Sequence, residues 1–161
     1  MHRGLYASPA YLDDHPAPRT PTEALAHRWI GRLQGSEGRV LRWETTGAVA
    51  VEMIETPRPA PSITFNEGEA AVAASVAGLG LVIAPPFAVE DPVRRGQLTP
   101  VLPAWQLGRS ALSVVYPSQR HLSPRLRGFV DWIDGVVRQH PSLALTPEAA
   151  PRRWAAGAAS P

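Results

Sequence analysis

Two glycines separated by one leucine, Gly78 and Gly80, are the first residues whose spacing suggests chemistry, because glycine-rich loops bind phosphate. A dinucleotide-binding loop lies between a strand and the following helix, so that the helix N–H groups face the pyrophosphate. Here the order is reversed, since an alanine-rich stretch precedes the glycines and the apolar run "LVIA" follows them. The pair therefore predicts the end of a helix, where glycine adopts a left-handed conformation.

The front of the same stretch, "SITFNEGEA", places polar residues where a strand gives way to a helix. Asn66 is a favourable N-cap, and Glu69 three residues later completes a capping-box pattern. The N–H groups of such a helix start can receive an anion or a carbonyl group. Glu67 and Glu69 put negative charge in the first turn, so a helix start satisfied by its own side chains is the competing interpretation.

No catalytic or metal-binding constellation stands out in the sequence. The histidines are dispersed without HxxxH or HExxH spacing, and there is no GxSxG motif and no cysteine. Adjacent acidic residues such as Asp13 and Asp14 rarely converge on one substrate atom. We therefore expect neither an enzyme, nor a cofactor, nor a metal.

Length and composition predict an ordinary globular chain. It has 161 residues, of which 44% are hydrophobic and 19% charged, enough for one domain with a core. All 16 basic residues are arginine, but they are scattered and the net charge is only +2, which disfavours a nucleic-acid-binding face. No apolar run reaches the ~20 residues of a membrane span, and the N-terminus lacks a signal-peptide core. We expect a soluble, cytoplasmic protein without a membrane partner.

Hydroxyl residues followed by proline predict where helices begin. Ser8-Pro9, Thr20-Pro21 and Ser123-Pro124 each combine an N-cap with proline at the first helical position. The helix from Ser123 to His140 is the strongest, with apolar residues at helical spacing: Leu126, Phe129, Val130, Ile133 and Val137. Residues 141–161 are rich in Ala, Pro and Arg without periodicity, and we expect a disordered tail there.

Strand-like runs alternate with these helices. The candidates are "GLYA", "RVLRWE", "AVAVEMI", "SITF", "LVIA", "LTPVL" and "ALSVVYP". Thr45 and Thr46 begin a predicted hairpin turn between the second and third of these runs. The continuous apolar runs "GLVIA" and "SVVY" are typical of strands buried on both faces. The alternation predicts an α/β sandwich with a mostly parallel, mixed sheet flanked by helices.

The order of these pieces resembles one known family. "RGLYASPAYLDDHPAPRTPTEALAHRWIG", a strand with "RW", "FNEGEAAVAASVAGLGLVIAP", "GQLTPVLPAW" and "VVYPSQRHLSPRLRGFVDWI" resemble the effector-binding region of LysR-type transcriptional regulators. The resemblance covers roughly residues 3 to 135, and each phrase alone is loosely specific, whereas five in this order are much more so.

The resemblance implies a periplasmic-binding-protein-like fold of two α/β subdomains with a small molecule in the cleft between them. Residues 1–140 would form the effector-binding region, with the second subdomain at about 8–102. The last strand and helix of the incomplete first subdomain would lie at about 103–140. The strand-to-helix junction would face the cleft, which makes Phe65, Asn66 and Glu67 candidate ligand-binding residues. Ser8, at the first crossover, and Tyr116, on the returning strand, are weaker candidates.

Departures from the family pattern limit what the resemblance implies. The DNA-binding helix-turn-helix and the first half of the first subdomain are not in the sequence, so we expect a truncated effector-sensing module that reaches DNA only through a domain absent from it. The expected partners are a small-molecule effector and a second copy or an intact paralogue. The alternative is an oligomerisation or interaction remnant that pairs with itself or with an intact regulator, through the exposed apolar face of the helix at 123–140 and the edge of the predicted strand "ALSVVY". A small-molecule-binding α/β enzyme is the weakest hypothesis.

Overall fold

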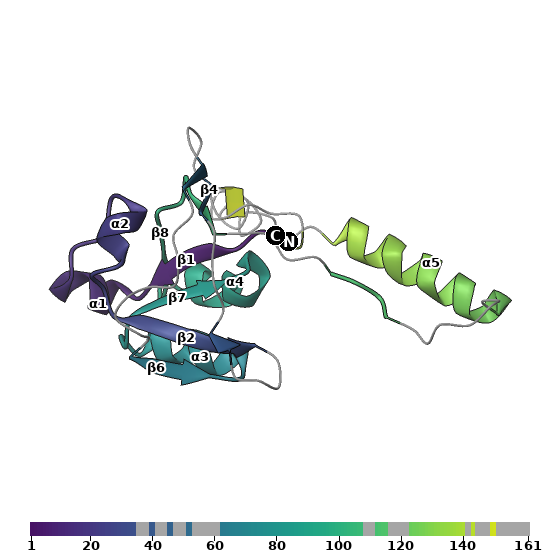
Figure 1. The fold of residues 1–161 in the computed structure, drawn as a ribbon, viewed down its shortest axis with the longest axis horizontal. Helices are drawn as coiled ribbons and strands as arrows, with labels where there is room; N and C mark the ends of the chain where they lie inside the picture. Colours follow the sequence, from purple (N-terminus) through teal and green to yellow (C-terminus); the bar gives the residue numbers. More distant parts are fainter. Residues whose placement is uncertain are drawn as a thin grey trace.

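The chain folds around a main β-sheet, whose strands β6, β2, β7, β1 and β8 are labelled in Figure 1. The structure, a computed structural model, describes residues 1–34, 39–40, 45–46, 51–52, 62–107, 112–115, 123–140, 143 and 149–150. The strands are β1 (Gly4–Ala7), β2 (Trp29–Gln34), β3 (Arg39–Val40), β4 (Thr45–Thr46), β5 (Val51–Glu52), β6 (Ile63–Phe65), β7 (Leu81–Ala84), β8 (Thr99–Val101) and β9 (Gln106–Leu107). The helices are α1 (Pro9–Asp14), α2 (Pro21–Ala24), α3 (Gly68–Val76), α4 (Pro86–Arg94) and α5 (Pro124–Gln139).

The main sheet is mixed, in the order β3-β2-β7-β1-β8, with β6 also paired to β2. β2 runs parallel to both β6 and β7, with Ile30 opposite Ile63 and Val82. β1 runs antiparallel to β7 and β8, and β3 antiparallel to β2. The prediction of a mixed sheet flanked by helices is confirmed, although the antiparallel share is larger than expected because β1 runs against both of its neighbours.

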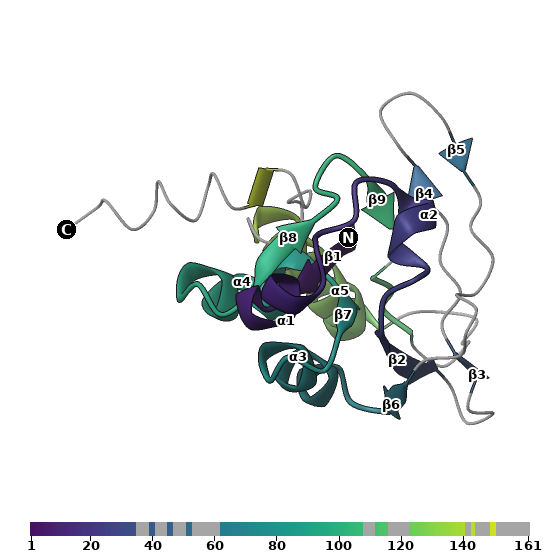
Figure 2. The same ribbon diagram turned by 90° about the vertical axis from the view of Figure 1, so that its left-hand side faces the viewer.

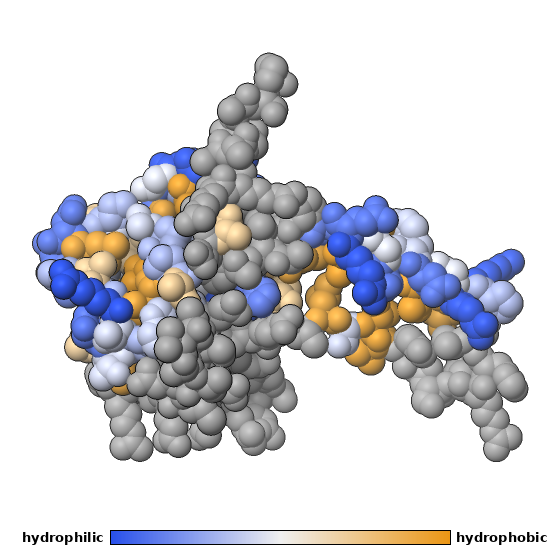
Figure 3. All heavy atoms as spheres, turned by 90° about the horizontal axis from the view of Figure 1, so that it is seen from above, coloured by the Kyte–Doolittle hydropathy of each residue, from blue (hydrophilic) through white to orange (hydrophobic). Residues whose placement is uncertain are grey.

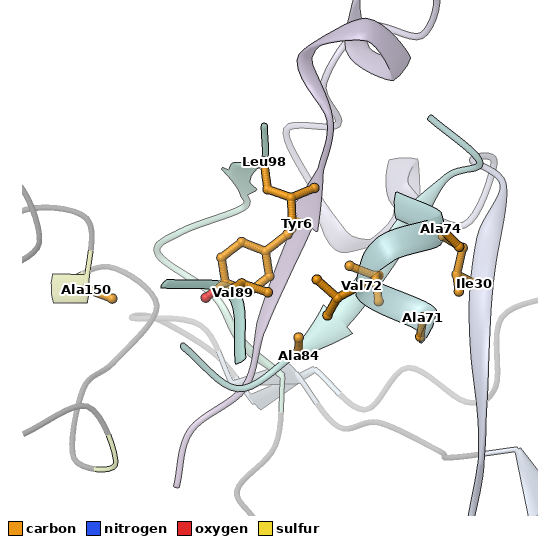
Figure 4. Packing of buried hydrophobic residues seen from close by; sticks show 10 residues of the cluster. Tyr6, Ile30, Ala71, Val72, Ala74, Ala84, Val89, Leu98 and Ala150 are labelled. Atoms are coloured by element: carbon orange, nitrogen blue, oxygen red, sulfur yellow. The ribbon is translucent and has the colours of Figure 1, made fainter. Parts of the chain in front are cut away.

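Alternating side chains of β1 and β7 divide the core into two layers, as the two-residue period of a strand requires. Tyr6, Val82 and Ala84 face α3 and α4 in one cluster, which Figure 4 shows from close by. Leu5, Ala7 and Leu81 pack on the other side with residues of α1 and α2. The prediction that "GLVIA" is a buried strand is confirmed, since Leu81, Val82 and Ala84 are all buried.

A second, small sheet lies beside the main one in the order β5-β4-β9 (Figure 2). β4 pairs antiparallel with β5, with Thr45 opposite Glu52 and Thr46 opposite Val51. The prediction that Thr45 and Thr46 begin a hairpin turn is therefore wrong, because both are strand residues and the connection comes after them. β9 joins the small sheet to the main body, because Leu107 is buried with the α1 and α2 side of the core.

The three predicted proline-initiated helices are confirmed. Ser8, Thr20 and Ser123 are the N-caps of α1, α2 and α5, and each side-chain oxygen accepts a backbone N–H three residues on. Glu23 completes the cap of α2 by accepting the backbone N–H of Arg19 at 2.8 Å.

The glycines at the end of α3 form a Schellman motif. Gly78 has a φ of 81°, its N–H donates to the carbonyl of Ser75, and the N–H of Leu79 donates to the carbonyl of Ala74. The prediction that these glycines end a helix, and form no phosphate loop, is confirmed.

Two predictions concern the chain after β9: a strand around "ALSVVYP" and a disordered tail at 141–161. The strand predicted around "ALSVVYP" is not formed in its described part, residues 112–115, where all four side chains are exposed and Val115 is 91% exposed. A strand needs a hydrogen-bonded neighbour, and no described strand lies beside this segment. In the predicted disordered tail the structure describes Leu143 and residues 149–150, and Ala150 is fully buried against the core. The disordered tail itself stays a prediction.

Candidate functional site

A cavity of about 670 Å³ lies at the edge of the sheet where α3 and α4 begin. The topology explains its position: β2, β6 and β7 run in parallel, so their carboxyl ends share one edge. α3 starts after β6 and α4 starts after β7, which brings the first turns of both helices to this edge. The lining residues are Arg32, Glu67, Gly68, Glu69, Ala71, Val72, Ile83, Ala84, Pro85, Phe87, Ala88, Glu90 and Asp91.

Both helices that open onto the cavity lack a side-chain cap. Glu67 is the N-cap residue of α3 and Pro85 that of α4, and neither makes a capping hydrogen bond. In contrast, hydroxyl groups cap the other three helices of the described chain. Uncapped N–H groups at a helix start, with the positive end of the helix dipole, favour acceptor atoms of a ligand.

The helix start at 66–69 corrects one detail of the sequence analysis. Asn66 was expected as the N-cap with Glu69 as its capping-box partner. Instead, Asn66 and Glu67 form the turn after β6, and α3 begins one residue later at Gly68. The first helical hydrogen bond of the backbone runs from Ala71 N–H to the carbonyl oxygen of Glu67 at 3.3 Å.

Arg32 brings a positive charge to the cavity from the end of β2. A methyl group built on Gly68 would lie 4.0 Å from the guanidinium carbon of Arg32, so the arginine reaches the first turn of α3. Burial lowers the pKa of Arg3, and the charge of Arg32 lowers it further. The pairing of Gly4 with Ala84 places this end of β1 at the same edge.

Carboxylates and apolar side chains complete the lining. Glu67, Glu69, Glu90 and Asp91 bring four acidic groups to the cavity. Asp91 also pairs with Arg95 at 3.2 Å, with both side chains mostly exposed, so this bond contributes little stability. The apolar part consists of β7 residues, Ala71, Val72 and the 43% exposed Phe87. Such a mixed lining suits a small polar molecule.

The structure brings together only part of the predicted ligand-binding set. Glu67 lines the cavity, whereas Phe65 is half-buried against the core and Asn66 is exposed in the turn. Ser8 is 2% exposed at the opposite end of α3, where its Oγ accepts the N–H of Tyr11. β1 runs against β7, so its carboxyl end meets the far edge of the sheet. Tyr116 lies outside the described residues.

The sequence analysis missed Arg32, Phe87, Glu90 and Asp91 as cavity residues. Phe87 follows the carboxyl end of "LVIA" by three positions, and the rule that ligands bind at the carboxyl ends of parallel strands points to that position. Arg32 carries no such local signal, because its strand was not recognised. Among the described residues, no group of three or more His, Asp or Glu side chains is arranged to hold a metal ion.

A cavity at the carboxyl edge of the parallel strands β6, β2 and β7 lies where α/β domains commonly bind small molecules. Comparison with known proteins gives the family. Residues 2–138 match the LysR substrate binding domain. The chain therefore belongs to the LysR substrate-binding domain family, whose members are transcriptional regulators and not enzymes.

Individual relatives agree with this assignment. The chain is 35% identical over 147 residues to an HTH-type transcriptional repressor of Pseudomonas aeruginosa, covering 91% of this chain and 45% of that protein. The regulatory domain of AphB from Vibrio vulnificus superposes with a TM-score of 0.63 at 20% identity, covering 83% of this chain and 65% of that one. The CrgA regulatory domain from Neisseria meningitidis gives 0.56 at 24% identity, covering 84% and 64%. The chain thus spans less than half the length of the curated relatives it matches.

Proposed function

We propose that the chain is an effector-sensing module of a LysR-type regulator and that its effector binds in the cavity at the start of α3 and α4. The observation that carries this proposal is the meeting of two uncapped helix starts and Arg32 around one cavity of about 670 Å³. The helix N–H groups and Arg32 would receive a carboxylate or carbonyl group of the effector. Glu67 and the other carboxylates would bind its donor groups.

Binding would act on the regulator by changing how two subdomains are oriented. A ligand shifts such an equilibrium only by its difference in affinity for the two arrangements. In an intact regulator, the oligomer would pass this change to DNA-binding domains. On this proposal Phe65 and Asn66 support the junction that carries Glu67, and Ser8, which caps α1 at the opposite edge, takes no part in binding. Tyr116 stays a weaker candidate for contact with the effector.

Thermal unfolding with a panel of small organic acids and amino acids tests the proposal. A ligand at 100 times its Kd stabilises the folded state by about 2.7 kcal/mol, which raises Tm measurably. Arg32→Gln should weaken binding of a carboxylate ligand by about tenfold or more, because a charged hydrogen bond contributes roughly 1.5–3 kcal/mol. Arg125→Gln, on the exposed side of α5, is the matched control and should leave binding unchanged. An equal loss of ligand affinity in Arg32→Gln and Arg125→Gln would count against the cavity as the binding site.

A second candidate function, self-association or pairing with an intact regulator, rests on α5. This helix stands away from the sheet in Figure 1 and has no buried residue. Its apolar side carries Phe129, Trp132 and Val136, which are 54%, 60% and 44% exposed. Figure 3 shows orange, hydrophobic atoms exposed in the part of the molecule from which α5 projects, beside blue, hydrophilic ones. A helix face of this kind favours a protein partner.

A further inference from the structure

Three aromatic rings meet at the edge of the sheet opposite the cavity. Tyr11 lies on α1, His15 is the C-cap of that helix, and His27 precedes β2. The rings of Tyr11 and His15 stack with centroids 4.4 Å apart and planes 7° apart. The His27 ring lies 5.8 Å from that of Tyr11 and 6.4 Å from that of His15. Two histidines that are 12 positions apart in sequence are therefore close neighbours.

The hydrogen bonds of this cluster depend on the protonation of His27. The buried Tyr11 hydroxyl accepts the backbone N–H of Arg28 at 3.0 Å and lies 3.1 Å from Nδ1 of His27. Neutral His27 can accept the Tyr11 O–H at Nδ1, which satisfies both groups. A protonated Nδ1 is a donor, so the Tyr11 hydroxyl hydrogen would lose its acceptor. An unsatisfied buried donor destabilises the folded state.

His15 is held by a different bond. Its Nδ1 lies 3.1 Å from the carbonyl oxygen of Tyr11, and because a carbonyl only accepts, this nitrogen carries the proton. The bond is compatible with both charge states of His15. Protonation of both rings would, however, place two positive charges at a 6.4 Å ring separation, where they repel each other.

The surrounding charges do not offset such repulsion. Arg28 adds a third positive group, with its guanidinium 5.3 Å from the centre of the Tyr11 ring. On α2, the carboxylate of Glu23 binds the backbone N–H of Arg19. Asp13 and Asp14 on α1 are exposed to solvent. The connection between α3 and β7, which packs on the Arg28 backbone, has no titratable residue from 77 to 80.

We propose that Tyr11, His15 and His27 form a proton-sensitive latch that holds α1 against the start of β2 while the imidazole of His27 is neutral. α1 follows β1 after a single residue, Ser8. Holding or releasing α1 therefore also acts on the end of β1, where the resemblance places the first crossover. Mild acid weakens the latch and loosens the attachment of α1 to the sheet. The inference does not depend on the effector cavity, which lies at the other edge.

The pKa of His27 gives the direction of the pH effect. Burial lowers this pKa below its usual 6.5, and His15 lowers it further. The neutral form is therefore favoured in the folded state. The contribution of His27 to stability is fully present above pH 6.5 and is lost as the pH falls through its lowered pKa in the folded protein.

NMR titration of the imidazole signals in the labelled full chain tests the latch. In the unaltered chain His27 should titrate below 6.5, and the His15→Gln variant should raise the pKa of His27 by removing the neighbouring charge. A pKa of His27 at or above 6.5, or one that His15→Gln leaves unchanged, would overturn the proposal. If the variant fails to fold, the pKa of His27 in the unaltered chain still tests the proposal on its own.

Urea unfolding at pH 7.5 and pH 5.5 gives the second readout. The unaltered chain should lose stability at the lower pH, and His27→Gln should lose distinctly less. His140→Gln is the matched control, because His140 is an exposed C-cap on α5 and should leave the pH dependence as it is. The same loss in His27→Gln as in the control would refute the latch.

Discussion

At the scale of single residues, two buried tyrosines on neighbouring elements have opposite hydrogen-bonding situations. The hydroxyl of Tyr6 is buried without a hydrogen-bond partner among the described residues, and burial raises its pKa. The hydroxyl of Tyr11 bonds to the Arg28 backbone and to His27. Tyr6 therefore stabilises the fold through its ring alone, whereas Tyr11 also stabilises it through the hydrogen bonds of its hydroxyl group.

Replacement of each tyrosine by phenylalanine tests this difference. Tyr6→Phe should leave the free energy of unfolding unchanged or raise it by up to about 1 kcal/mol, because an unsatisfied buried hydroxyl is removed. Tyr11→Phe should lower it by about 1–3 kcal/mol, because the Arg28 N–H loses its acceptor. Urea denaturation at pH 7.5 measures both. A larger loss for Tyr6→Phe than for Tyr11→Phe would contradict the described hydrogen bonding.

The two glycines after α3 offer a second pair. Gly78 needs only a left-handed backbone, so Gly78→Ala should destabilise by about 1–2 kcal/mol. At Gly80, a Cβ would lie 2.4 Å from the carbonyl oxygen of Arg28, and φ is +146°. Gly80→Ala should therefore lower the free energy of unfolding clearly more than Gly78→Ala, and thermal unfolding of both variants measures the difference. Equal costs would mean that the close approach to Arg28 is relieved by small movements.

At the scale of elements, the helix starts of the described chain divide into those capped by a side chain and those that open uncapped onto the cavity. Ser8 is occupied in capping α1, whereas Glu67 at the start of α3 makes no such bond. Ser8→Ala should therefore lower stability by about 1 kcal/mol. Glu67→Ala should leave stability nearly unchanged and alter affinity for the effector. Thermal unfolding measures the stability of both variants, and ligand titration measures their affinity for the effector. Lower stability of Glu67→Ala together with altered affinity of Ser8→Ala would reverse the two roles.

Helix starts were predictable from sequence because their signals are local. Ser8, Thr20 and Ser123 carry the cap, the proline and the apolar spacing within a few residues, and all three predictions are confirmed. The capping-box pattern predicts the start of α3 one residue early, because the observed N-cap residue, Glu67, makes no side-chain capping hydrogen bond. The cavity could be predicted only in part. Arg32 meets Glu67 through the pairing of β2 with β6, which are separated by almost 30 residues and share no local pattern.

At the scale of the whole molecule, the exposed helix α5 predicts association. Its Phe129 and Trp132 rings contact each other at a centroid distance of 5.8 Å and are more than half exposed. Light scattering over a range of concentrations should show oligomers. Trp132→Glu should weaken association by more than about tenfold, because interface tryptophans often contribute 2 kcal/mol or more. Arg127→Gln, an exposed position on the same helix, is the control. A monomer at every concentration would exclude this surface as a self-association site.

In the part of the chain that the structure describes, no helix combines the length and apolar character needed to cross a bilayer. The matching family is described as a substrate binding domain, and the cavity and the exposed face of α5 are separate candidate surfaces for the two proposed functions. The cavity lies at the carboxyl edge of the sheet, whereas α5 lies beyond it.

The central claim, that the effector binds at the start of α3 and α4, is tested most directly by amide NMR of the full chain with a ligand that raises Tm. We predict saturable shift changes concentrated at the cavity-lining residues of the two helix starts: Glu67, Gly68, Glu69, Phe87, Ala88, Glu90 and Asp91. Saturable changes concentrated instead on α1 and the start of β2, at the opposite edge of the sheet, would contradict the claim.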